Sequence, residues 1–105
     1  MAVTGDGGFA QYMAEVTTAV KHGMNITHVL LNNGQLGKIA KEQRAGEWDV
    51  WQTTLHNPDF SAFARNCGAF GVRVTGVAQL DAALAEAVAY DGPAMIEVMT
   101  DPDLV

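Results

Sequence analysis

Residues 3–16 read VTGDGGFAQYMAEV and place three glycines and an aspartate directly before an amphipathic segment. Residues 2–4 have the composition of the end of a buried strand. Phe9, Met13 and Val16 then recur at the spacing of one face of a helix. Glycines between a strand and a helix let the backbone turn sharply and approach a ligand closely. The stretch therefore predicts a strand, a tight turn and a helix, with a ligand at the turn.

Further strands and helices alternate along the rest of the chain. The apolar run at residues 26–31 suits a strand that is covered on both faces, and Gly23 stands where a helix ends before it. A short helix is expected at residues 38–44, and a loop with both tryptophans follows it. The remaining predicted elements are a helix in residues 57–68, capped by Asn57 and ended by Gly68, a strand at 70–74, a helix in 78–92 with Leu80, Leu84 and Val88 on one face, and a strand at 93–99.

This alternation predicts the fold class. Strands that alternate with helices build a parallel, doubly wound α/β sheet, because each helix carries the chain back to the start of the next parallel strand. The 105 residues are enough for one domain. Only a few strand-like residues precede the glycines, so we expect a sheet that is truncated at its N-terminal side and a chain that is a fragment of a longer protein.

Composition argues against several classes of partner. The net charge is −6, whereas nucleic-acid phosphates and anionic membrane surfaces attract clustered Lys and Arg. No apolar run approaches the length of a membrane span, and the first residues do not read as a secretion signal. The single cysteine, Cys67, cannot form an internal disulfide. We therefore expect neither nucleic acid nor a membrane as a partner, and a cytoplasmic location.

The aspartate in TGDGGF indicates which kind of ligand the turn holds. In a doubly wound sheet, ligands bind at the carboxyl ends of the strands, and the free N–H groups of the following helix favour a phosphate. A carboxylate beside a phosphate is repelled unless a cation lies between them. Asp6 among the glycines therefore suggests a diphosphate together with Mg²⁺.

A second polar motif follows the next predicted strand. LLNNGQLG, residues 30–37, contains two amides, Asn32 and Asn33, at the carboxyl edge where Asp6 is expected. Amide oxygens are good Mg²⁺ ligands that add no charge, and a backbone carbonyl of the next turn can supply a third oxygen. Taken alone, GDG and NN are most often ordinary turns. The sequence has neither a GK[ST] phosphate loop nor a GxGxxG fingerprint, so the argument depends on two motifs that each close a predicted strand.

Together the two motifs resemble the thiamine diphosphate motif, in which GDG is followed some two dozen or more residues later by NN. Asp6 and Asn33 lie 27 positions apart. GDGGFAQYMAEVTTAVKHGMNITHVLLNNGQLGKI is similar to the corresponding stretch of pyruvate oxidases, acetolactate synthases and related 2-keto acid decarboxylases. NPDFSAFARNCGAFGVRV and DGPAMIEV resemble the segments that follow in those enzymes. The resemblance implies that residues 1–105 are part of a C-terminal thiamine diphosphate-binding domain.

The resemblance also implies roles for individual residues. Asp6 and Asn33 would bind Mg²⁺ through side-chain oxygens, and Gln35 through its main-chain carbonyl. The metal would anchor the diphosphate, while the thiazolium ring attacks a 2-keto acid that loses carbon dioxide and passes the remaining fragment to an acceptor. The cofactor-binding residues that it implies are Gly5, Asp6, Gly7, Gly8, Asn33, Gln35, Leu36 and Gly37.

Enzymes of this kind have further parts that this chain does not match. They have three domains, and the glutamate that activates the cofactor lies on the first domain, usually of a second subunit, so no catalytic residue is assigned here. We expect the chain to work with its own N-terminal domain in a homo-oligomer, to be inactive alone, and to bind cofactor weakly or not at all. Use of FAD by the full-length enzyme is left open. So is the alternative of a stand-alone, non-catalytic diphosphate-binding or oligomerisation module.

Other polar residues have simpler explanations. His22 ends a helix, His28 lies inside a strand and His56 precedes a helix, so each is expected to be structural. Lys38 departs from the apolar residue that related oxidases and synthases tend to carry. It either pairs with a substrate carboxylate or is solvated at the start of a helix.

Overall fold

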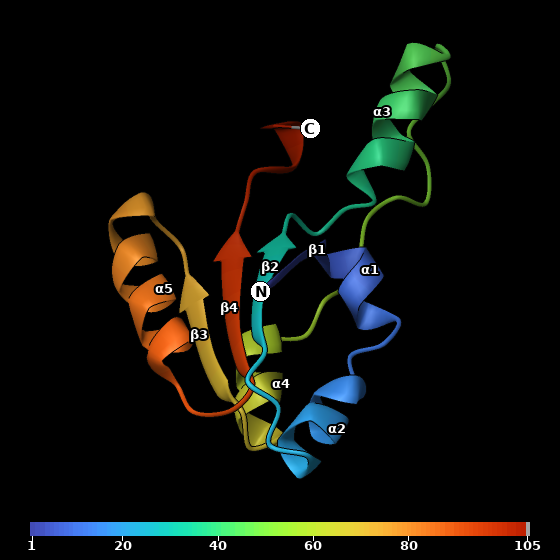
Figure 1. Cartoon of the computed structure of the whole chain (residues 1–105). Helices are drawn as coiled ribbons and strands as arrows, with labels where there is room; N and C mark the ends of the chain where they lie inside the picture. The colour runs from blue at the N-terminus through green and yellow to red at the C-terminus, as the bar shows by residue number, and fades with distance from the viewer. Residues whose placement is uncertain (105) are drawn as a thin grey trace.

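The computed structural model describes residues 1–104 and contains a four-stranded sheet (Figure 1). Its strands are β1 (Ala2–Gly5), β2 (Thr27–Asn32), β3 (Phe70–Val74) and β4 (Ala94–Met99), in the order β1-β2-β4-β3. Every neighbouring pair is parallel, which confirms the predicted α/β class. The carboxyl ends of all four strands therefore lie at one edge of the sheet, where ligands of such folds bind.

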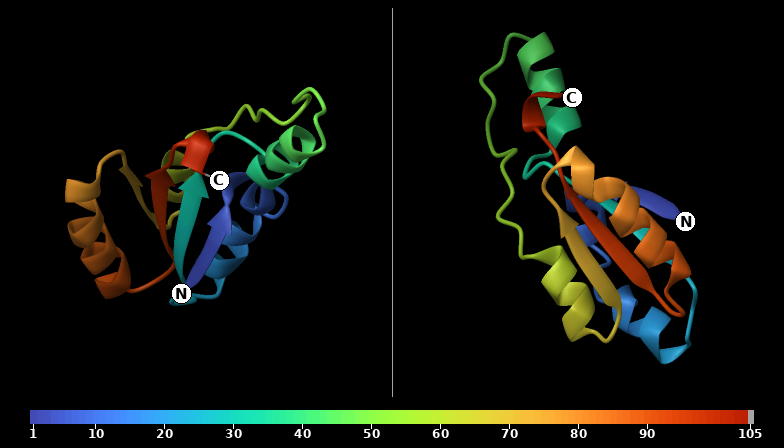
Figure 2. Two further views of the ribbon diagram at one scale, coloured as in Figure 1. Left: turned by 90° about the horizontal axis from the view of Figure 1, so that it is seen from above. Right: turned by 90° about the vertical axis from the view of Figure 1, so that its left-hand side faces the viewer.

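Helices cover the two faces of the sheet unequally. α1 (Asp6–Ala10), α2 (Glu15–Lys21) and α4 (Phe60–Asn66) pack on one face, and α5 (Leu80–Ala89) packs on the other (Figure 2). α3 (Gly37–Ala45) projects from the carboxyl edge of the sheet. Two short 3-10 turns, Val77–Gln79 and Pro102–Leu104, precede α5 and follow β4.

The first predicted helix is interrupted. Between α1 and α2, the backbone N–H groups of Tyr12, Glu15 and Val16 donate to carbonyls three residues earlier instead of four. These tighter bonds break the α-helical ladder, so the prediction of one continuous helix is wrong. Met13 and Val16 still pack against the core. The helical spacing therefore correctly predicted that Met13 and Val16 face the core, although the segment is not one continuous helix.

The glycines predicted after the first helix and after α4 stand where these helices end, whereas the start of α4 differs from the prediction and α5 is shorter than predicted. Gly23 and Gly68 have φ values of 58° and 89° and follow α2 and α4, where glycine adopts this conformation without strain. The N-cap of α4 is Asp59, whose Oδ1 accepts a 2.8 Å hydrogen bond from Ala62 N. The prediction that Asn57 caps this helix is wrong, because the cap lies two residues later. The Asn57 side chain is thereby free to take other partners.

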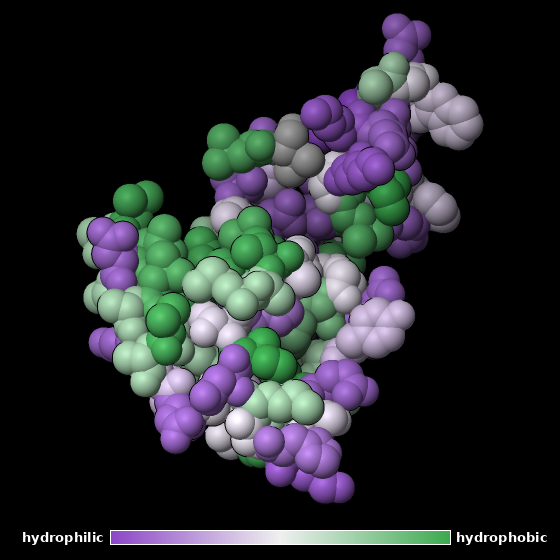
Figure 3. Space-filling model, viewed as in Figure 1, coloured by the Kyte–Doolittle hydropathy of each residue, from purple (hydrophilic) through white to green (hydrophobic). Residues whose placement is uncertain are grey.

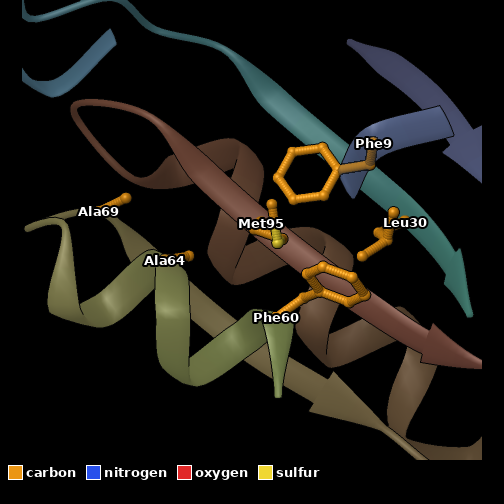
Figure 4. Packing of buried hydrophobic residues seen from close by; sticks show 6 residues of the cluster. All are labelled: Phe9, Leu30, Phe60, Ala64, Ala69 and Met95. Carbon is orange, nitrogen blue, oxygen red and sulfur yellow. The ribbon is translucent and has the colours of Figure 1, made fainter. Parts of the chain in front are cut away.

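Two hydrophobic clusters hold the helices on the sheet. On the α5 face, the buried helix positions are Ala83 and Ala87, which bring the helix close to the strands, while Leu80 and Leu84 flank the contact. Val88 is 60% exposed, so of the three side chains expected on one face only Leu80 and Leu84 pack against the core. The opposite cluster joins α1 and α4 to β2 and β4, and its buried side chains converge as Figure 4 shows: Phe9, Leu30, Phe60, Ala64, Ala69 and Met95.

Part of the α5 face is uncovered. α5 packs on β3 and β4, whereas Val3 of β1 and Leu31 of β2, which the pleat places on the same face, are 62% and 41% exposed. Figure 3 shows hydrophobic side chains over this face and hydrophilic ones on the projecting segment around α3. In that segment Trp48 and Trp51 are largely exposed. Within residues 1–104, no helix has the length and apolar character that crossing a membrane requires.

Candidate functional site

Asp6 directly follows β1 and is only 2% exposed. Its Oδ2 accepts hydrogen bonds from Gly34 N at 2.8 Å and from Asn57 Nδ2 at 2.6 Å, while its Oδ1 accepts from Gly7 N at 3.0 Å. An ionised carboxylate has about four acceptor positions, two on each oxygen. Oδ2 is therefore fully used, and Oδ1 retains acceptor capacity. These donors fix the orientation of the carboxylate and leave Oδ1 able to accept a further bond.

Asn57 joins Asp6 to Asn32, the last residue of β2. Asn57 Nδ2 donates to Asp6 and also to Asn32 Oδ1, at 3.0 Å. Gly34 N lies close to the same two side chains and is 3.1 Å from Asn32 Oδ1. Three segments that are distant in sequence thus meet around one carboxylate. Asn57 is a site residue that sequence analysis missed, because its place before a proline and an acidic residue resembled a helix cap.

The turn after β2 presents further oxygens. Asn33 Oδ1 accepts from Gln35 N at 3.0 Å, which orients the amide. The turn is tied to the loop before α4 by a 2.7 Å hydrogen bond from Leu36 N to Thr53 O. In the part of the chain that the structure describes, Gln35 Oε1 is buried without a hydrogen-bond partner. A buried polar atom without a partner is uncommon and points to a ligand or water at this place.

A cavity of about 410 Å³ at the carboxyl edge brings most of the predicted residues together. A carboxylate, an amide and carbonyl oxygens form a donor set that suits a hard cation such as Mg²⁺, so the residues fit the metal that the resemblance implies. Gly5 has open space where a Cβ would stand, which leaves room for a ligand against the backbone. The residues lining the cavity include Gly5, Asp6, Asn33, Gln35, Gly37, Lys38, Thr100 and Asp101.

The other three predicted cofactor residues lie elsewhere. A Cβ on Gly7 would stand 2.8 Å from Leu36 Cδ2, so glycine at position 7 lets these two residues pack together. Gly8 lines a second cavity of about 270 Å³ between α1, α2 and the sheet. The walls of this second cavity are mostly apolar and include Val16 and Met95. The glycine-rich turn therefore borders two cavities, and Gly7 and Leu36 line neither of them.

An ion pair between a buried carboxylate and a partly exposed arginine lies on the α4 face of the sheet, behind the site. Glu97 of β4 is fully buried, and Arg73 of β3 donates to both of its carboxylate oxygens at 3.0 Å. The hydrogen bonds to Glu97 raise the pKa of Arg73 above its ordinary value. Arg73 also lies 3.6 Å from Asp59, whose pKa is lowered chiefly by the hydrogen bond from Ser61 Oγ. Sequence analysis did not identify this pair.

Other titratable residues stand apart from the carboxyl-edge cavity or at its rim. His28 Nε2 is 2.7 Å from Thr4 Oγ1, its ring packs edge-on against Phe9, and it lines the second cavity. Burial lowers the pKa of His28. Lys38 lines the first cavity, but its side chain is 88% exposed and 4.0 Å from Glu42. Among residues 1–104, no three His, Cys, Asp or Glu side chains are grouped to hold a metal, so a metal bound by Asp6 would also need amide or carbonyl oxygens.

Comparison with known proteins defines the class to which this fold and site belong. Residues 1–98 match the family described as "Thiamine pyrophosphate enzyme, C-terminal TPP binding domain". The chain therefore belongs to this family, whose cofactor is also called thiamine diphosphate. The match covers both the strand and turn that carry Asp6 and the strand and turn that carry Asn33.

Individual relatives are similar over nearly the whole of this chain. The chain is 44% identical to YdaP of Bacillus subtilis (strain 168), which is named as thiamine pyrophosphate-containing, over 94% of this chain and 17% of that protein. It is 34% identical to the mitochondrial acetolactate synthase catalytic subunit of Saccharomyces cerevisiae, over 94% of this chain and 15% of that subunit. The fold matches the thiamine diphosphate-dependent 4-hydroxybenzoylformate decarboxylase of Rhodococcus jostii RHA1 with a TM-score of 0.87 at 24% identity, over 94% of this chain and 19% of that one. The chain thus spans less than a fifth of the length of each.

Proposed function

We propose that this chain supplies the Mg²⁺ and diphosphate part of the cofactor site in a longer enzyme that decarboxylates a 2-keto acid and transfers or oxidises the product. Asp6 and Asn33 bind the metal through side-chain oxygens, and Gln35 binds it through its main-chain carbonyl. The observation that carries the proposal is the unused acceptor capacity of Asp6 Oδ1 in a cavity that Asn33 and Gln35 also line. Membership of a thiamine pyrophosphate-binding family supports it.

The residues of this chain bind and orient the cofactor. When bound, thiamine diphosphate supplies a carbanion that attacks the keto carbon and an electron sink for the pair that carbon dioxide leaves behind. Gly34 N and Asn57 hold the Asp6 carboxylate before any metal arrives, so little reorganisation is needed on binding. Gly5 lets the backbone approach the diphosphate. Mg²⁺ would then neutralise the repulsion between this diphosphate and Asp6.

The rest of the active site is proposed to come from outside this chain, from its own N-terminal domain and a second subunit. The chain spans 17% of YdaP and 15% of the yeast synthase subunit, which leaves most of such a protein to supply those parts. Val3 and Leu31 are exposed apolar side chains on the uncovered face and support packing against further protein. By itself the chain is expected to bind cofactor weakly and to have no activity.

Paramagnetic Mn²⁺ tests the metal site in the isolated chain, because it broadens amide NMR signals near the bound ion even when binding is weak. With thiamine diphosphate present, we expect selective broadening of the amide signals of Gly7, Gly34 and Gln35. Asp6→Asn keeps the size of the side chain and removes its charge. It should weaken Mn²⁺ binding about tenfold or more, which corresponds to about 1.4 kcal/mol.

Asp81→Asn is the matched control for this experiment. Asp81 lies in the first turn of α5 and is exposed, so its substitution removes the same charge at a distance from the site. Mn²⁺ binding should be unchanged. Equal weakening by both substitutions would mean that Mn²⁺ responds only to net charge. Uniform broadening over the whole chain would contradict the assigned metal site.

A further inference from the structure

We propose that the buried Glu97, paired with the partly exposed Arg73, positions Asp6, acting on the metal-binding carboxylate through Asn32 and Asn57. The inference rests on the proposed function, in which Asp6 binds the metal. Arg73 of β3 is hydrogen-bonded to Glu97 of β4, and Glu97 to Asn32 of β2. Asn32 is hydrogen-bonded to Asn57 in the loop before α4, and Asn57 to Asp6. The four residues that precede Asp6 in this chain of hydrogen bonds are absent from the lining of the carboxyl-edge cavity. They therefore act on a ligand through Asp6.

Glu97 uses all of its acceptor positions. Its Oε1 accepts from Asn32 Nδ2 at 2.8 Å and from Arg73 Nη2 at 3.0 Å, and its Oε2 accepts from Ser61 N and Arg73 Nε, both at 3.0 Å. A buried carboxylate is tolerated when it is paired and fully hydrogen-bonded in this way. Well-packed apolar residues at such places are often equally stable or more stable. Stability alone therefore does not explain why position 97 carries a charge. The need for a group that only accepts hydrogen bonds does explain it.

The charge of Glu97 fixes which way the Asn32 amide points. An ionised carboxylate only accepts hydrogen bonds, so Asn32 presents Nδ2 to it and turns Oδ1 toward the site. Oδ1 then accepts from Asn57 Nδ2 at 3.0 Å and from Gly34 N at 3.1 Å. A reversed amide would place Nδ2 against these two donors. The orientation of Asn32 thus decides whether Asn57 and Gly34 have a second acceptor beside Asp6 Oδ2.

Asn57 and Gly34 carry this orientation to Asp6. With one Nδ2 proton of Asn57 held by Asn32, the other is directed at Asp6 Oδ2, at 2.6 Å. Gly34 N approaches the same oxygen to 2.8 Å. Both acceptor positions of Oδ2 are then occupied by protein donors, and Oδ1 is the oxygen left for the cation. Asn32 is therefore connected to the Asp6 carboxylate in two ways, through the Asn57 side chain and through Gly34 N.

Glu97 also fixes the segment that carries Asn57. Its Oε2 accepts from Ser61 N in the first turn of α4, and Arg73 lies 3.6 Å from the N-cap residue Asp59. Asn57 stands two residues before this cap. One ion pair therefore constrains both partners of the hydrogen bond between Asn57 and Asn32.

Glu97→Gln tests the positioning role with almost no change of shape. The new amide nitrogen must face one of the donors that the carboxylate accepted, so Asn32 is no longer held in one orientation. In the presence of thiamine diphosphate, we expect Mn²⁺ affinity to fall about tenfold, as is typical when a residue that orients a metal ligand is changed. Without metal, the NMR signals of the Gly34 N–H and of the Asn57 side-chain amide should shift.

The double variant Asn32→Asp with Glu97→Gln is the rescue. It exchanges the amide and the carboxylate, so a hydrogen bond between positions 32 and 97 is kept and an oxygen still faces Asn57. We expect it to regain most of the Mn²⁺ affinity that Glu97→Gln loses and to restore the Asn57 signal toward its wild-type position. Two independent structural losses would instead add, and the double variant would bind Mn²⁺ more weakly than either single variant.

Val74→Ala separates positioning from loss of stability. Val74 is 2% exposed and packs on the α5 face, so its truncation should lower the thermal midpoint while leaving Mn²⁺ affinity unchanged. Unchanged Mn²⁺ affinity and unchanged Gly34 and Asn57 signals in Glu97→Gln would overturn the positioning role, whatever the midpoint. If the wild-type chain did not bind Mn²⁺, the metal site would depend on protein beyond this chain. The metal-free signals would then decide the positioning role by themselves.

Discussion

The two cavities of this chain share one glycine-rich turn and differ in the groups around it. Gly5 and Asp6 line the larger cavity, where amides from the β2 turn and the loop before α4 hold a buried carboxylate. Gly8 lines the smaller cavity, whose walls are mostly apolar. The larger cavity is a candidate site because its polar atoms are oriented and one carboxylate oxygen retains acceptor capacity. Volume alone would not distinguish the two, since both are large enough for a small ligand.

Truncation on the apolar side should have the largest effect on stability. Phe9 is 7% exposed and packs edge-on against Phe60, with ring centroids 5.5 Å apart. Phe9→Ala would add its volume to the smaller cavity, and the free energy of unfolding should fall by about 3–5 kcal/mol. Urea unfolding followed by circular dichroism measures this loss. A loss below about 1 kcal/mol would mean that the apolar cavity collapses readily and is not held open by its walls.

A matched pair of glycine substitutions tests the boundary between the cavities. Gly7→Ala brings a Cβ to 2.8 Å from Leu36 Cδ2 and should destabilise the chain by about 1 kcal/mol, because the overpacked leucine must shift. Gly8→Ala meets nothing within 4 Å and lies in α1, so it should stabilise the chain by about 0.5–1 kcal/mol. Thermal unfolding of both variants gives the comparison. Equal effects would contradict the different packing of these neighbours.

The smallest expected effect concerns the one histidine that lines the apolar cavity. Burial lowers the pKa of His28 below its ordinary value of 6.5, so the folded chain binds this proton less tightly than the unfolded chain. Stability should therefore fall as the pH decreases through 6.5 toward the folded pKa and should level off below it. His28→Gln removes the titration, so the difference in unfolding free energy between the two proteins should change across this range. Parallel pH profiles would show that His28 does not contribute.

More of the fold than of the candidate site could be predicted from the sequence. Strand and helix periodicity identified the four strands, and GDG and NN identified Asp6 and Asn33 as neighbours of one cavity. Periodicity could not reveal the break between α1 and α2, because the apolar side chains before and after the break all face the core. Asn57 also escaped prediction, since an amide before proline suits a helix cap as well as it suits a site.

The ion pair between Glu97 and Arg73 shows what could not be predicted from the strand sequences alone. AMIEVM and FGVRV each contain one charged residue in an apolar run, and such a residue alone is compatible with an exposed strand position. Only the parallel register, which sets Arg73 opposite Glu97, makes them partners. That register depends on the β1-β2-β4-β3 order, and local sequence does not specify strand order.

The projecting segment around α3 has a consequence for optical experiments. Trp48 and Trp51 are the only tryptophans of the sequence, both are 71% exposed, and the Trp51 backbone is held by the side chain of Gln43. Their fluorescence in the folded chain is therefore that of indole in water, and unfolding changes it little. A partner that covers this segment would shift the emission to shorter wavelengths. Tryptophan fluorescence in this protein thus reports docking on the projecting segment and changes little when the core folds or unfolds.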